Sequence, residues 1–264
     1  MIILLYLGLG AFAGLAAGLF GIGGGLVIVP TLIYAFHYQG VAPEVLTHLA
    51  VGTSLATIVI TSISSVRGHH LAGAIRWPIF WSLTPGILVG GYFGVRFAAS
   101  LSGPALQLAI GVFAIIIAAQ MGFGMRPAPH RDLPGRLPLL AVGGIIGSVS
   151  AIFGIGGGSL TVPYLSWCNV RVQQAIATAA ACGLPIALSG GLVNIWQGWG
   201  NEQLPEWSSG FVYWPAFLGI ILSSAVCARF GARLAHSLPA DRLKQIFALF
   251  LLVVGCQFIY KALG

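Results

Sequence analysis

The sequence has 264 residues, of which 58% are hydrophobic and only 6% are charged, and its mean hydropathy is +0.96. This composition excludes an ordinary soluble domain and is typical of a membrane protein. The net charge of +7 does not indicate nucleic-acid binding, because most basic residues lie in short loops between apolar segments. These segments are too long and continuous for the strands of an outer-membrane barrel. We therefore predict an all-α polytopic membrane protein.

The apolar segments, taken in chain order, form two similar series. The first has two short arms at about 1–20 and 26–38, then spans at about 44–66, 75–98 and 104–123. The second has arms at about 138–153 and 159–168, then spans at about 172–195, 211–235 and 241–262. Residues 1–4 lack the basic region of a signal peptide, so we expect the first arm to be retained.

The same hexapeptide, FGIGGG, separates the two arms of each series, at residues 20–25 and 153–158. Three glycines disfavour a helix interior, because glycine loses the most backbone entropy on folding. A Val-Pro pair follows each hexapeptide at the same distance. We predict a helix break in each copy, with Pro30 and Pro163 contributing to it.

These matches predict an internal duplication. A shift of 133 residues superposes the hexapeptides, a shift of 125 places Thr53 on Thr178, and a shift of 137 places Trp77 on Trp214. The expected organisation is a first repeat at residues 1–125, a cytoplasmic linker loop at 126–137 and a second repeat at 138–264.

Loop charges favour opposite orientations for the two repeats. The loop after the first full span contains Arg67 and Arg76, whereas the equivalent loop of the second repeat contains Glu202 and Glu206 and no basic residue. Since basic loops stay in the cytoplasm, we expect inverted repeats, each with a re-entrant glycine-broken hairpin and three transmembrane helices. Both termini would lie outside. Arg96 would also lie outside, so parallel repeats remain the alternative.

The glycine breaks are the predicted substrate site. A helix that starts after each break would present unpaired N–H groups and the positive end of its dipole to an anion. The alternative is close packing of small residues, which the spacing of Gly86, Gly90 and Gly94 indicates elsewhere, either within the chain or against a second copy in a homodimer. The predicted binding residues at the breaks are Gly23, Gly24, Gly25, Leu26, Gly156, Gly157, Gly158 and Ser159.

Neutral polar residues in the following span of each repeat could complete this site. They are His48, Thr53, Ser54, Thr178 and Asn194. Hydroxyl, amide and imidazole groups donate hydrogen bonds to oxyanions without burying a charge, although hydroxyls in helices often bond their own backbone instead.

Proton handling and cofactors have little support in the sequence. No Asp or Glu lies well inside a span, so Glu44 and His48 are the predicted proton-handling residues. The cysteines form no C-x-x-C pair and the histidines are scattered, so we expect no metal site, disulfide framework or cofactor. The hexapeptide also lacks the Lys-Ser/Thr of a nucleotide-binding P-loop.

The segments GLFGIGGGLVIVPTL, HLAVGTSL and AIFGIGGGSLTVPYL resemble the TauE/SafE family of sulfite exporters and sulfonate permeases. The resemblance covers nearly the whole chain. It implies a non-enzymatic, multi-pass carrier of the bacterial inner membrane for sulfite, sulfoacetate or other organosulfonates. Its expected partners are the small anion and membrane lipid, not nucleic acid.

The resemblance leaves several functions open. The expected mechanism is alternating access, with export favoured. An anion channel and an uptake permease are alternatives, and an integral-membrane enzyme is a more remote one.

Overall fold

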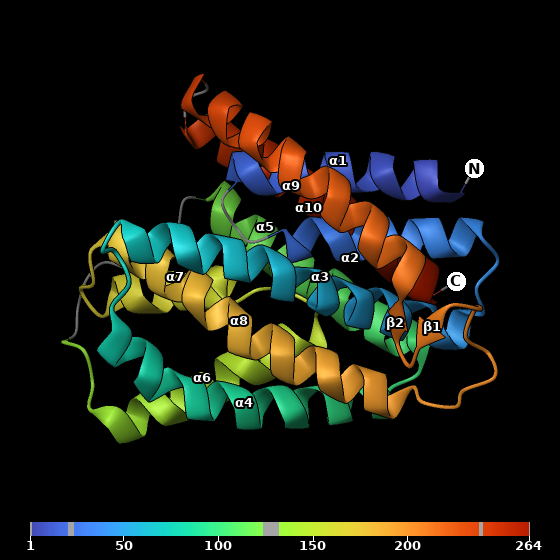
Figure 1. The fold of residues 1–264 in the computed structure, drawn as a ribbon, viewed down its shortest axis with the longest axis horizontal. Coiled ribbons are helices and arrows are strands. Elements are labelled where there is room, and N and C mark those ends of the chain that lie inside the picture. Colours follow the sequence, from blue (N-terminus) through green and yellow to red (C-terminus); the bar gives the residue numbers. More distant parts are fainter. Residues whose placement is uncertain (1, 21–23, 124–131, 238–239, 264) are drawn as a thin grey trace.

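The computed structural model describes residues 2–20, 24–123, 132–237 and 240–263 (Figure 1). These ranges form an all-helical bundle with one short β-hairpin. The elements in order are α1 (Ile2–Phe20), α2 (Gly25–Tyr38), α3 (Pro43–Leu71), α4 (Trp77–Ser100), α5 (Gly103–Gly122), α6 (Arg136–Ile152), α7 (Gly158–Trp167), α8 (Val172–Gln197), β1 (Ser208–Ser209), β2 (Val212–Tyr213), α9 (Trp214–Ser237) and α10 (Ala240–Leu263).

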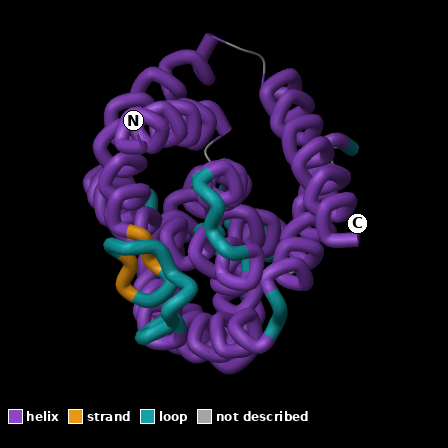
Figure 2. Tube along the Cα trace, turned by 90° about the vertical axis from the view of Figure 1, so that its right-hand side faces the viewer, coloured by secondary structure: helices purple, strands orange, loops and turns teal. Residues whose placement is uncertain are grey.

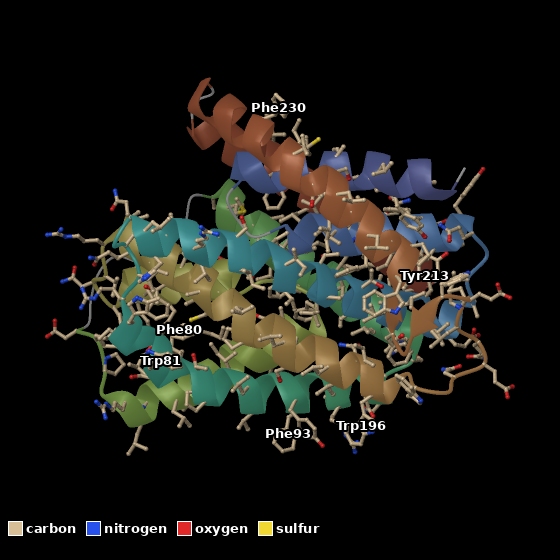
Figure 3. The ribbon with its side chains drawn as sticks, viewed as in Figure 1. Phe80, Trp81, Phe93, Trp196, Tyr213 and Phe230 are labelled. Atoms are coloured by element: carbon tan, nitrogen blue, oxygen red, sulfur yellow. The ribbon has the colours of Figure 1, made fainter. Side chains whose placement is uncertain are left out.

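Five segments in the described part of the chain are long and apolar enough to cross a membrane, and they lie in α3, α4, α5, α8 and α10. The apolar stretches of α1, α2, α6 and α9 among the described residues are shorter. Large apolar side chains on the outside of the bundle, including Trp81, Phe93 and Trp196, point outward (Figure 3). A surface of this kind is suited to lipid, so the chain is a multi-pass membrane protein.

Two boundaries differ from the sequence prediction. The last span but one begins at Trp214 and not near residue 211, because Val212 and Tyr213 pair with Ser209 and Ser208 in the hairpin. Helix α6 already begins at Arg136, inside the predicted linker, of which residues 126–131 lie outside the described ranges.

The prediction that the two prolines contribute to the breaks was wrong. Pro30 lies inside α2 and Pro163 inside α7, each at the sixth residue of its helix. A proline near the start of a helix removes only one backbone hydrogen bond, so both helices continue past it. The described second break, between α6 and α7, lies within residues 153–157, upstream of Pro163.

The connections between helices alternate between two sides of the bundle. The start of α1, the end of α10 and the α2–α3, α4–α5 and α8–α9 connections lie at the right of Figure 1, here called the terminal side. The ends of α3, α5, α7 and α9 and the starts of α4, α6, α8 and α10 lie at the left, here called the linker side. Figure 2 views the bundle from the terminal side, where both chain ends face the reader.

Charged residues are distributed unequally between these sides. Arg67, Arg76, Arg136 and Arg171 lie at helix ends or loops of the linker side, whereas Glu44, Glu202 and Glu206 lie on the terminal side. Two basic residues near the terminal side are engaged with aromatic rings. The Arg96 guanidinium lies 5.6 Å from the centre of the Trp196 ring, and Lys261 Nζ lies 5.5 Å from that of Tyr34.

Small residues bring helices from distant parts of the chain together. Helix α4 packs along α6, and α1 packs along α9. A Cβ on Gly90 would lie 2.0 Å from Gly144 O, and one on Gly14 would lie 2.5 Å from Ser224 Cα. The face formed by Gly86, Gly90 and Gly94 is therefore used within the chain, against α6. Helices α3 and α8 pack on each other, and α5 packs on α10.

Candidate functional site

The second glycine break is a tight turn between α6 and α7. Gly154 has a φ of 65°, a left-handed conformation that glycine adopts readily. The Ile155 N–H donates to Ser150 O at 2.9 Å and the Gly154 N–H to Ala151 O at 3.4 Å, which is the Schellman pattern that ends a helix. Helix α7 then begins at Gly158, and the Thr161 N–H donates to Gly157 O at 2.8 Å.

The first break precedes α2 and is described from Gly24 onward, so the predicted binding residue Gly23 lies outside the described ranges. Gly24 has a φ of 74°, and its carbonyl accepts the N–H groups of Val27 and Ile28, both at 2.9 Å. Glycine is favoured here because its backbone adopts this left-handed conformation readily.

The two breaks are in direct contact. A Cβ on Gly25 would lie 2.7 Å from Ile155 Cα and 2.8 Å from Gly154 O. A Cβ on Gly154 would in turn lie 3.0 Å from Val51 Cα in α3. The two identical hexapeptides, far apart in the sequence, therefore meet in the interior between helices of both halves of the chain.

The central helices α3 and α8 flank the contact. The Ser54 hydroxyl donates to Gly154 O at 2.8 Å, so α3 holds the tip of the second break. On the other side, a Cβ on Gly157 would lie 3.4 Å from Ala179 O in α8. Ser54 is fully buried. Of the predicted side chains outside the hexapeptides, Ser54 is the one that contacts a break through a described hydrogen bond.

Backbone donors at the breaks are unpaired within the described part of the chain. No described hydrogen bond involves the N–H groups of residues 156–160, or those of Gly25 and Leu26. The first N–H groups of a helix lack an intrahelical partner, and the helix dipole places positive charge there. The breaks can therefore donate hydrogen bonds to an anion, without any charged side chain.

Buried hydroxyls near the second break add to these donors. Ser150 and Thr161 are fully buried, and their oxygens, like that of Ser159, have no hydrogen-bond partner among the described residues. Leaving such a group unpaired costs on the order of 1–3 kcal/mol, which a bound acceptor would offset. Of these three residues, Ser159 is predicted from the sequence, whereas Ser150 and Thr161 are not. The sequence signal for both is a hydroxyl residue at a position where the first repeat is apolar.

Thr53 and Thr178 occupy equivalent positions in the two repeats and make equivalent hydrogen bonds, away from the breaks. Thr53 Oγ1 in α3 accepts the Tyr213 N–H at 3.0 Å, at the start of α9. Thr178 Oγ1 in α8 accepts the Arg76 N–H at 3.0 Å, at the start of α4. Each hydroxyl satisfies a backbone donor at a helix start, where such groups lack intrahelical partners.

The remaining predicted side chains lie toward the terminal side. His48 Nε2 lies 3.1 Å from Ala98 O, and the imidazole is 5.2 Å from the Phe211 ring centre. Asn194 Nδ2 donates to Gly190 O in its own helix at 2.8 Å. His48 precedes Ser54 by six residues of helix, or about 9 Å of rise. The structure thus separates these two residues from the glycine contact.

Two observations on the described residues concern proton transfer and metal binding. Glu44 is exposed and makes no ion pair with His48 among the described residues. Within the described ranges, no group of three or more His, Cys, Asp or Glu side chains is placed to hold a metal ion.

The whole chain is similar to known proteins. Residues 6–258 match the family described as "Sulfite exporter TauE/SafE". The chain belongs to the TauE/SafE family. The family match confirms the resemblance seen in the glycine motifs. It covers nearly the whole of this chain.

Curated relatives of this TauE/SafE chain are named as membrane transporters. A "Probable membrane transporter protein" of Haemophilus influenzae is 41% identical over 261 residues, covering 98% of each chain. One from Methanocaldococcus jannaschii is 30% identical over 250 residues, covering 93% of this chain and 91% of the relative. YunE of Bacillus subtilis is 25% identical over 279 residues, covering 97% and 96%. No solved structure gives a significant match.

Proposed function

We propose that this TauE/SafE protein is a secondary transporter that moves small sulfur-containing oxyanions, such as sulfite, sulfoacetate or other organosulfonates, by alternating access. The observation that carries the proposal is the contact between the two glycine breaks, where Gly25 faces Gly154 and Ile155 beside unpaired backbone donors. Broken helices that meet in this way are a recurrent substrate site in membrane carriers. The family description supports sulfite as the first substrate to test.

We further propose that the two repeats are inverted. The hairpin formed by α1 and α2 begins and ends on the terminal side, whereas that formed by α6 and α7 begins and ends on the linker side (Figure 1). Contacts between equivalent elements of the two repeats also support inverted repeats. Helix α1 packs on α9 as α6 packs on α4, and Thr53 bonds the start of α9 as Thr178 bonds that of α4.

The linker side is proposed to face the cytoplasm of a bacterial cell, because arginines concentrate there. Export then follows the membrane potential, since an interior-negative potential favours anion exit by about 2.3 kcal/mol per charge per 100 mV. No coupling ion is needed for this direction.

The proposed substrate site comprises both breaks and Ser54. In the alternating-access scheme, helices of the two repeats rock around this contact and expose it to one side at a time. His48, Thr53 and Thr178 contribute by holding the surrounding helices, since their described bonds are to backbone groups of other elements, whereas Asn194 bonds a carbonyl of its own helix.

Flux into proteoliposomes tests the function directly. The purified protein is expected to move radiolabelled sulfite or sulfoacetate faster than protein-free vesicles, with saturation, whereas chloride and sulfate serve as comparison anions. Absence of flux for both sulfur anions would contradict the proposed function. Currents far above carrier turnover would instead identify a channel.

A further inference from the structure

We infer that the side-chain donors of the transporter's anion site are one-sided: the hydroxyls of Ser62, Ser150, Ser159 and Thr161 surround the second break and bind the substrate, whereas the residues at the equivalent positions beside the first break are apolar. This inference rests on the proposed function and assigns unequal roles to two identical hexapeptides.

The hydroxyls near the second break differ from most of the described hydroxyls in the helices, although Thr47 in α3 and Ser208 in β1 also have no hydrogen-bond partner. Thr31, Thr84 and Ser223 each donate to a carbonyl of their own helix, at 2.8 to 2.9 Å, as hydroxyls in membrane helices commonly do. Ser150 and Thr161, both fully buried, have no such bond within the described ranges. Their donor capacity is therefore available to a ligand.

These hydroxyls lie around the start of α7. A Cβ on Gly157 would lie 3.2 Å from Thr161 Oγ1, so this oxygen faces the glycine turn. A Cβ on Gly183 in α8 would lie 3.1 Å from Ser62 Oγ and 3.9 Å from Gly157 N. Ser62 belongs to α3 and is only 7% exposed. Hydroxyls from α3 and α7 thus approach the same backbone donors from two directions.

The equivalent positions around the first break carry no polar group. The shift of 133 residues pairs Ser150 with Ala17, Ser159 with Leu26 and Thr161 with Ile28, and the shift of 125 pairs Ser62 with Ala187. Leu26 and Ile28 are themselves buried. The duplication has therefore kept the glycines in both copies but the surrounding hydroxyls in only one.

This arrangement fits a small oxyanion. An oxyanion has several acceptor oxygens, which can receive both backbone N–H and hydroxyl donors at a helix start. The contact of Gly25 with Gly154 and Ile155 would bring the backbone of the first break close to the bound anion. The inference follows from unequal chemistry at equivalent positions, not from the glycines themselves.

Matched valine variants test the inference. Thr161→Val and Ile28→Val produce the same side chain at equivalent positions of the two breaks, and Thr161→Ser retains the hydroxyl. In proteoliposomes with radiolabelled sulfite and sulfoacetate, we expect Thr161→Val to raise KM about tenfold or more. We expect Ile28→Val to remain within about twofold of wild type and Thr161→Ser to stay close to it. Thermal unfolding of each purified variant shows whether it is folded.

The outcomes separate this inference from the proposed function. If wild type transports either anion and Thr161→Val matches Ile28→Val, the one-sided site is wrong while the function stands. If Thr161→Val is poorly folded, Ser150→Ala provides the same test, and an unchanged KM in that variant overturns the inference. If wild type transports neither anion, the proposed function fails and the inference fails with it.

Discussion

At the residue scale, Gly25 shows what the glycine motif predicts from the sequence and what depends on the fold. The sequence correctly indicates that FGIGGG interrupts helices, because three glycines are unfavourable in a helix interior. It does not indicate that Gly25 contacts Ile155, because nothing in local propensity specifies which distant backbone will approach a glycine. Likewise, the sequence groups His48 and Asn194 with the breaks, whereas the fold places their hydrogen bonds at other helices or at their own backbone.

The first prediction concerns that contact. Gly25→Ala places a methyl group 2.7 Å from Ile155 Cα, so the two breaks must separate. Sulfite flux in proteoliposomes is expected to fall at least about tenfold, since a misplacement of about 1 Å can cost a hundredfold in rate. Gly68→Ala is the control, because a Cβ there meets nothing within 4 Å. Equal flux in the two variants would show that the contact is not needed.

The second prediction concerns the reciprocal threonines. Thr53→Val removes the acceptor for the Tyr213 N–H, and Thr178→Val removes that for the Arg76 N–H. Each variant should lose about 1–3 kcal/mol of stability, the cost of an unpaired buried donor, measured as a lower midpoint of thermal unfolding in detergent. Thr31→Val, which removes bonds to carbonyls of its own helix, should have a smaller effect. A midpoint unchanged in both threonine variants would argue against these bonds.

At the element scale, helix periodicity and small residues predict that close packing occurs but not between which helices. The Gly86-Gly90-Gly94 face was visible in the sequence, and the structure supplies α6 as its partner. The hairpin at residues 208–213 was not predicted, because its two-residue strands are too short for an alternating pattern. Gly210, with a φ of 53°, allows its turn.

The third prediction uses two glycines on one helix. In α1, a Cβ on Gly14 would lie 2.5 Å from Ser224 Cα, whereas one on Gly8 would meet nothing within 4 Å. Gly14→Ala should therefore lower the thermal unfolding midpoint by several degrees by separating α1 from α9. Gly8→Ala should leave it unchanged or slightly higher, because alanine favours a helix. The opposite order would mean that α1 does not pack on α9 through this face.

At the scale of the whole molecule, loop charges and hydropathy predicted different features of the fold. The arginine loops anticipated which connections share a side, because the basic residues of short loops stay on one side of a membrane. Hydropathy predicted most helices but not the bounds of α9, whose start depends on a hairpin and not on lipid thickness. Neither signal identifies the cross-pairing of helices between the two halves.

The fourth prediction tests the inverted arrangement with an equivalent pair of loop positions. In a cysteine-free background, Tyr38→Cys and Arg171→Cys change exposed residues related by the shift of 133. A membrane-impermeant maleimide should label Tyr38→Cys from outside intact cells and Arg171→Cys only in inside-out vesicles. Labelling of both from the same side would instead establish parallel repeats.

The pairing of α1 with α9 also constrains how the protein can be made. Because α1 ends at Phe20 and α9 begins at Trp214, the ribosome completes 213 of the 264 residues before synthesis of the partner of the first helix begins. During that interval the face of α1 that carries Gly10 and Gly14 lacks its partner in α9. The first helix is therefore inserted into the bilayer before its partner is synthesised. A chain truncated before α9 should be a substrate for quality-control proteases.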